Sequence, residues 1–140
     1  MNDELKEIEH SVNGKTVLLV DDDKFLLDLY IMKFLKEGYT VQGCLSVSDA
    51  LKLLHGGLMP DAVVFDLTMP EYDGFYLLKT IHEENLVPHA VLIALSNQME
   101  DADRTRAKEL GADDFIVKAT KIPSEVVNII TESIQKYYKA

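Results

Sequence analysis

The sequence predicts an α/β fold in which one parallel β-sheet is covered by helices on both faces. Five short apolar or β-branched runs alternate with segments in which apolar residues recur at helical spacing. Successive runs are far enough apart for a helical crossover, which parallel strands require and which places helices on the faces of the sheet. The pattern predicts five strands but leaves their order in the sheet open.

The five predicted strands are short runs bounded by polar or turn-forming residues. In chain order they read TVLLV, YTVQGC, AVVF, AVLIAL and FIV. We therefore expect strands at residues 16–20, 39–44, 62–65, 90–95 and 115–117.

The helices between the strands are predicted from apolar spacing and from residues that begin or end helices. Ser46 with Asp49 resembles a capping box at the start of the second helix, and Pro123 is a typical opening residue for the last. Gly38 and Gly111 follow helical segments, as C-terminal caps do. The apolar residues at helical spacing include Leu26, Leu29, Tyr30 and Phe34 in the first segment and Phe75, Leu78 and Ile81 in the third.

A single domain is expected from the length and composition. The 140 residues suffice for one core and are too few for a second full domain, and 47% apolar with 27% charged residues is a globular composition. Residues 1–14 precede the first strand and carry Leu5, Ile8 and Val12 at roughly helical spacing, so a tail and a short extra helix are both compatible. The domain itself is expected at residues 15–138.

The net charge indicates which partners are unfavourable, and the single cysteine and the lengths of the apolar runs indicate the compartment. Acidic residues outnumber Lys and Arg by 24 to 14, and the net charge of -10 disfavours direct contact with nucleic acid or anionic lipid. No apolar run is long enough for a signal peptide or a membrane span, and Cys44 cannot form an internal disulfide. We therefore expect a cytoplasmic protein.

Polar residues at the carboxyl ends of the predicted strands form the candidate site. Ligands of parallel α/β sheets bind beyond these ends, so side chains from several strands should meet at one edge. Grouped carboxylates repel one another unless a hard cation or a basic side chain offsets the repulsion, and Mg²⁺ prefers oxygen ligands. The residues are Asp21, Asp22 and Asp23 after the first strand, Asp66 and Thr68 after the third, Ser96 and Asn97 after the fourth, and Lys118 after the fifth.

This set of side chains suits phosphoryl transfer, which depends mainly on positioning and on neutralising charge. Asp66 is the natural nucleophile, since a cation and an ammonium group would stand beside it. Ser96 and Lys118 would each bind a phosphoryl oxygen. Asp23 is better explained as a helix cap than as a metal ligand, because three consecutive side chains cannot all face one ion.

The segments VLLVDDDK, VVFDLTMPEYDG, VLIALSN and FIVK resemble the signature segments of the receiver domains of two-component response regulators. The resemblance covers residues 15–138. It implies a flavodoxin-like doubly wound sheet of strand order 2-1-3-4-5 and a signalling domain, not an enzyme, that catalyses only its own phosphorylation and dephosphorylation. The expected phosphodonor is a sensor histidine kinase or a phosphotransfer protein, and the expected cofactor is Mg²⁺ or Mn²⁺.

The resemblance also assigns roles to individual residues. Asp66 corresponds to the phosphoacceptor, Asp22 to a direct metal ligand with Asp21 as its acidic neighbour, and Thr68 to the source of a backbone carbonyl for the metal. Ser96 and Lys118 correspond to the switch hydroxyl and the phosphate-binding lysine, and Phe115 to the switch aromatic. A downstream protein, not identified by the sequence, would bind the switched face. The resemblance also allows a phosphorylation-dependent homodimer through the fourth helix, fifth strand and fifth helix.

Two positions depart from the family pattern. Ala119 follows Lys118 where the family usually has a proline preceded by a cis peptide bond, so the cis or trans state of this peptide is open. Asn97 is larger than the alanine or glycine usual after the switch hydroxyl, and its bulk predicts slow phosphoryl turnover.

Two other functions share some of these sequence features. Residues 17–23 also resemble the opening motif of haloacid-dehalogenase-like phosphatases, in which Asp21 would be the nucleophile and Asp23 the acid. In that family the lysine precedes a later pair of acids, whereas Lys118 here follows Asp113 and Asp114. A pseudo-receiver that only docks proteins often lacks the acidic ligand, acceptor, hydroxyl or lysine, and this chain retains all four.

Overall fold

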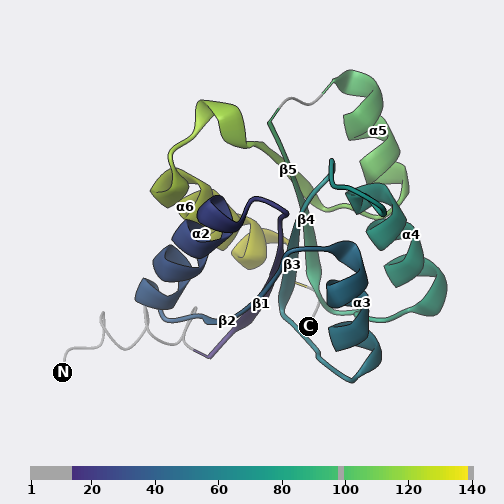
Figure 1. The fold of residues 1–140 in the computed structure, drawn as a ribbon, viewed down its shortest axis with the longest axis horizontal. Helices are drawn as coiled ribbons and strands as arrows, with labels where there is room; N and C mark the ends of the chain where they lie inside the picture. Colours follow the sequence, from purple (N-terminus) through teal and green to yellow (C-terminus); the bar gives the residue numbers. More distant parts are fainter. Residues whose placement is uncertain (1–13, 98–99, 139–140) are drawn as a thin grey trace.

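The predicted α/β architecture is confirmed by the structure, a computed structural model that describes residues 14–97 and 100–138 (Figure 1). Its parallel sheet has five strands in the order β2-β1-β3-β4-β5, as the resemblance implied. The strands are β1 (Thr16–Val20), β2 (Thr40–Cys44), β3 (Ala62–Asp66), β4 (Val91–Ser96) and β5 (Asp114–Val117). The helices are α2 (Lys24–Lys36), α3 (Val47–His55), α4 (Gly74–Glu84), α5 (Asp101–Glu109), the short 3₁₀ helix η1 (Lys118–Thr120) and α6 (Pro123–Tyr137).

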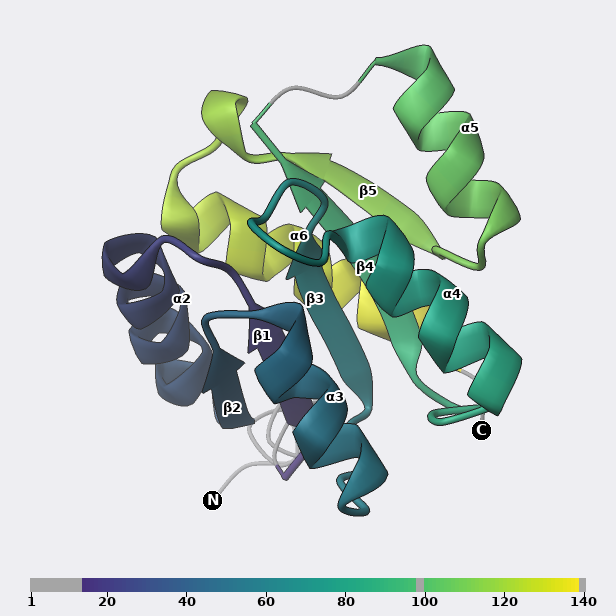
Figure 2. The same cartoon turned by 45° about the vertical axis from the view of Figure 1, so that its right-hand side comes forward.

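The helices cover the sheet on both faces, with α2 and α6 on one side and α3, α4 and α5 on the other (Figures 1 and 2). Side chains alternate along each strand between these two layers. In β1, for example, Val17 and Leu19 pack with α2 and α6, whereas Leu18 and Val20 pack with the opposite helices. Burial on both faces explains why β1, β3 and β4 are nearly continuous apolar runs.

The capping residues determine where the helices begin and end. Ser46 accepts a hydrogen bond from the Asp49 N–H at 3.1 Å, which confirms it as the N-cap of α3. Pro123 is the first residue of α6, also as predicted. Gly38 and Gly111, with φ of 98° and 109°, follow α2 and α5 in the left-handed conformation that glycine adopts most readily.

The predicted and observed strands differ by at most one residue at either end. Two of these differences concern the site, because Asp66 and Ser96 are the last residues of β3 and β4 rather than the first residues after them. Both side chains are therefore held by the ordered end of a strand. The question left open at Lys118–Ala119 is answered too, since the peptide bonds of the described residues are all trans.

The expected tail or short helix at residues 1–14 lies outside the described residues except for Gly14, whose N–H donates to the carbonyl oxygen of Gly38 at 3.3 Å. The boundaries 15–138 therefore stay a prediction. None of the helices in the described part of the chain has the length and apolar content needed to cross a lipid bilayer.

Candidate functional site

The polar residues predicted to meet at the carboxyl edge of the sheet line one cleft. Its volume is about 540 Å³, and it lies where β1, β3, β4 and β5 end. This position follows from the parallel topology, which brings the carboxyl ends of neighbouring strands side by side. The lining residues are Asp21, Asp22, Asp23, Leu26, Asp66, Thr68, Ser96, Asn97 and Lys118.

Lys118 joins the two buried carboxylates of the cleft. Its Nζ donates to Asp21 Oδ2 at 2.8 Å and to Asp66 Oδ2 at 2.7 Å. The three residues come from the ends of β1, β3 and β5 and are only 2%, 6% and 7% exposed, in the order Asp21, Asp66, Lys118. A buried charge is tolerated when it is paired and hydrogen-bonded, so each of these groups depends on the others.

The second oxygen of each buried carboxylate is held by a backbone N–H two residues further along the chain. The Asp23 N–H donates to Asp21 Oδ1 at 2.9 Å, and the Thr68 N–H donates to Asp66 Oδ1 at 3.0 Å. Aspartate forms such local turns readily. Together with Lys118 they fix both carboxylates from two sides, so the groups are oriented before any ligand binds.

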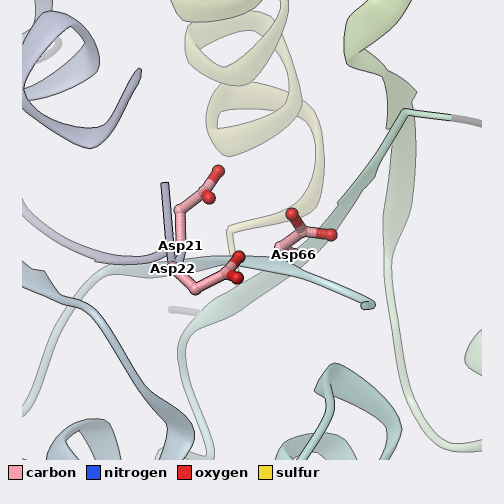
Figure 3. Close-up of side chains that lie close together, drawn as sticks. All are labelled: Asp21, Asp22 and Asp66. Carbon is pink, nitrogen blue, oxygen red and sulfur yellow. The ribbon is translucent and has the colours of Figure 1, made fainter. Parts of the chain in front are cut away.

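A third carboxylate completes a cluster that can bind a metal ion. Asp21, Asp22 and Asp66 each offer one oxygen, and these oxygens lie within 4.8 Å of one another (Figure 3). Asp22 is exposed to the cleft, whereas the other two are buried. Carboxylate oxygens at this spacing are suitable ligands for a hard divalent cation, so the donor set fits such an ion.

Burial and pairing shift two ionisation equilibria in the cleft. Burial raises the pKa of Asp66 above its ordinary value, although the hydrogen bonds from Lys118 and from the Thr68 N–H partly oppose the effect. Burial alone would lower the pKa of Lys118, but its bonds to Asp21 and Asp66 outweigh burial and raise it. Lys118 is therefore an ammonium ion at neutral pH.

The remaining predicted site residues fall into two groups. Ser96 is buried, whereas Thr68 and Asn97 are exposed, and all three line the cleft. Phe115 does not line it: its half-buried ring packs against the core beneath α3, α4 and α5, with the Arg104 guanidinium 5.6 Å from the ring centre. It is paired with Ala94 in the sheet, two residues before Ser96.

The family model for the response regulator receiver domain matches residues 17–131, which is most of the chain. The chain belongs to the response regulator receiver family. It is therefore a signalling domain of two-component phosphorelay systems, and domains of this family interact with histidine kinases and downstream effectors.

Curated relatives and a solved structure agree with this family. The chain is 35% identical over 124 residues to a protein named probable transcriptional regulator ycf27 of Guillardia theta, covering 89% of the chain and 47% of the relative. It is 30% identical over 126 residues to the regulatory protein VanRc of Enterococcus gallinarum, covering 90% of the chain and 52% of the relative. The chain thus spans about half the length of these relatives. The CheY-like receiver domain of Methanospirillum hungatei superposes with a TM-score of 0.79 at 24% identity, covering 89% of this chain and 97% of that one.

The receiver fold also bears on the competing phosphatase hypothesis. That hypothesis needs the Asp23 carboxylate as an acid, but Asp23 Oδ1 accepts the Leu26 N–H at 3.1 Å and caps α2, as the sequence predicted. Sequence reasoning missed Leu26 as a lining residue and the two N–H groups that hold the carboxylates. The position of Leu26, three residues after a capping aspartate, was the signal that could have placed it beside the cleft.

Proposed function

We propose that Asp66 accepts a phosphoryl group from a phosphohistidine on a sensor histidine kinase or a phosphotransfer protein, in a reaction that depends on Mg²⁺ or Mn²⁺. The observation that carries this proposal is the pair of hydrogen bonds from Lys118 Nζ to Asp66 and Asp21, in the cleft that Asp22 and Ser96 also line. A nucleophilic carboxylate, an ammonium group and a cation-binding cluster at one place are the parts that phosphoryl transfer requires.

The cation would be held by the carboxylates of Asp21, Asp22 and Asp66 and by the backbone carbonyl of Thr68. This assignment is supported by the spacing of the three carboxylates and by the position of Thr68 on the cleft wall. A bound divalent cation supplies positive charge that neutralises the phosphoryl oxygens. Oxygen ligands and exposure to water favour Mg²⁺, which usually retains several water ligands.

In the proposed transfer a carboxylate oxygen of Asp66 forms a bond to phosphorus while the phosphorus–nitrogen bond of the donor breaks. The donor imidazole leaves with the electron pair and takes up a proton. Lys118 already lies within hydrogen-bonding distance of Asp66 and would pair with one phosphoryl oxygen, and the Ser96 hydroxyl would donate to another. Attack of water on phosphorus later returns the carboxylate and inorganic phosphate.

The read-out would be a movement of Ser96 and Phe115 that follows phosphorylation. The new group adds about -1.5 to -2 charges, enough to draw nearby donors inward. Phe115 lines a second groove of about 790 Å³ that α5, β5 and α6 form. A downstream protein, or a second copy in a phosphorylation-dependent homodimer, would bind this surface. Light scattering with and without a phosphoryl mimic tests the dimer.

Sequence composition supports two further expectations, which stay predictions. The net charge of -10 disfavours direct binding to nucleic acid or membrane, and the single cysteine, buried Cys44, is compatible with the cytoplasm. The longer relatives are named as regulators, so a regulatory output is proposed for the system in which this domain acts.

The test of the proposed function is to incubate the protein with Mg²⁺ and a small phosphodonor and to map the phosphate. We expect label on Asp66 in the wild type, no label in Asp66→Asn, and no label when EDTA replaces Mg²⁺. Ser133→Ala is a useful control, because this buried serine lies on α6 and is not among the lining residues of the cleft. Label that persists in Asp66→Asn would contradict the assignment.

A further inference from the structure

Asp23 makes two backbone-directed hydrogen bonds that link the start of α2 to the cleft. Its carboxylate accepts the Leu26 N–H at 3.1 Å and caps the helix. Its own N–H donates to Asp21 Oδ1 at 2.9 Å. The residue that ends the acidic run therefore connects a helix terminus with one of the two buried carboxylates.

The equivalent turn after β3 lacks this connection. There the N–H that holds Asp66 belongs to Thr68, an exposed loop residue, and the following helix α4 has its own N-cap, Asp73, further along the chain. Of these two turns, the one after β1 has a single residue as both the helix cap and the donor to a buried carboxylate. The orientation of Asp21 should therefore depend on a side chain that does not bind the metal.

We propose that Asp23 is a positioning residue whose capping bond fixes its own peptide N–H on Asp21, and thereby orients Asp21 toward Lys118 and the metal cluster. The capping bond restrains the Asp23 backbone at φ -82° and ψ 99°, the conformation from which the N–H reaches back to Asp21. The consequence for metal binding rests on the proposed function, whereas the orientation of Asp21 does not.

The competing explanation is that Asp23 acts through its charge, as a nearby anion or a further ligand. Two observations favour positioning. Among the described residues, the carboxylates close enough to share an ion are those of Asp21, Asp22 and Asp66. Asp23 does not belong to this group. The Asp23 carboxylate is also engaged by the Leu26 N–H. Residues that orient metal ligands typically change metal affinity by about 10-fold to 100-fold when they are removed.

The experiment compares three variants of the full chain. Asp23→Ala removes the cap, whereas Asp23→Asn removes the charge but keeps a good capping side chain. Ser46→Ala is the matched control, because Ser46 makes the same kind of cap at 3.1 Å on α3 and does not line the cleft. Circular dichroism establishes that each variant is folded before the measurements.

The first measurement is hydrogen exchange of the residue-23 amide in metal-free protein, read by NMR. We expect faster exchange in Asp23→Ala and wild-type exchange in Asp23→Asn and Ser46→Ala. The second is the Mg²⁺ dissociation constant by calorimetry, which should rise about 10-fold in Asp23→Ala and stay within about threefold of wild type in the other two.

Three results would overturn the proposal. The first is an exchange rate of the residue-23 amide in Asp23→Ala that equals the wild-type rate. The second is an Asp23→Asn variant that binds Mg²⁺ as weakly as Asp23→Ala, and the third is a loss of Mg²⁺ affinity in Ser46→Ala as large as that in Asp23→Ala. The second would assign the effect to charge, and the third to general destabilisation. A wild-type protein that binds no Mg²⁺ would instead contradict the proposed function, while amide exchange would still decide whether Asp23 orients Asp21.

Discussion

Replacement of Lys118 by methionine should leave two buried carboxylates without their counter-charge. Asp21 and Asp66 are 2% and 6% exposed, and their cluster oxygens lie within 4.8 Å of each other. Two unit charges at this separation repel by about 3 kcal/mol at an effective dielectric constant of about 20. Removal of one partner from a buried ion pair typically costs about 3–5 kcal/mol. We therefore expect metal-free Lys118→Met to lose about 3 kcal/mol of unfolding free energy at pH 7.

Urea unfolding followed by circular dichroism measures this loss, and Lys79→Met is the control. Lys79 is an exposed residue of α4, so its replacement should change stability by less than about 0.5 kcal/mol. Added Mg²⁺ should restore part of the stability of Lys118→Met, because a cation that binds the folded cluster stabilises the fold.

The unfolding free energy lost in Lys118→Met should be smaller at low pH than at pH 7. Burial raises the pKa of Asp66 even with Lys118 present, and removal of the ammonium should raise it further. A carboxyl group whose folded pKa is raised favours folding below its unfolded pKa, and that contribution is lost as the pH rises through the folded value. The gap between Lys118→Met and wild type should therefore narrow as the pH falls through the raised pKa of Asp66. A metal-free variant as stable as wild type at pH 7 would refute the reasoning.

Three other predictions concern the walls of the cleft and the core. Asn97→Ala should speed the loss of phosphate from Asp66, timed after the donor is removed, because it clears one wall of the cleft, and unchanged or slower loss would contradict this. Gly74→Ala should cost about 1–3 kcal/mol in urea unfolding, since a Cβ there would lie 2.5 Å from the Asp66 carbonyl oxygen; wild-type stability would show that the loop yields. Cys44, whose pKa burial raises to about 11 with a smaller contribution from Asp49, should react slowly with iodoacetamide at pH 8 until the protein is unfolded, and rapid labelling of folded protein would contradict its burial.

The secondary structure could be predicted because its signals are local. The run TVLLV became β1 without change, and Ser46 and Pro123 mark helix starts through side-chain and ring geometry within a few residues. The strand order could not be predicted in this way. The residues of β1 do not indicate that it lies between β2 and β3, because that arrangement depends on packing between distant segments. The expected order came from the family resemblance.

The residues that line the site could be predicted from the sequence, but the hydrogen bonds between them could not. The parallel topology brings every strand end to one edge, so Asp66, Ser96 and Lys118 were expected at the same edge once the strands were identified. Their meeting in one cleft also depends on the strand order, which places β3, β4 and β5 side by side. The direction of each side chain depends on the backbone of the loop that follows its strand. The double hydrogen bond of Lys118 and the inward N–H of Asp23 therefore required the structure.

The charges of the cleft explain why the proposed reaction needs a divalent cation in addition to Lys118. The three carboxylates of the metal cluster and the ammonium group of Lys118 leave two negative charges unbalanced, and the Asp23 carboxylate also lines the cleft. A further phosphoryl group of about -1.5 to -2 charges must enter beside them. Lys118 is already shared between Asp21 and Asp66, so it cannot neutralise an incoming anion without releasing part of that pairing. Asp22 is the exposed member of the cluster and the one best placed to recruit a cation from solvent. The order of events that follows is cation first and phosphodonor second, and it predicts that a phosphodonor without Mg²⁺ leaves Asp66 unlabelled even at concentrations that saturate the labelling in its presence.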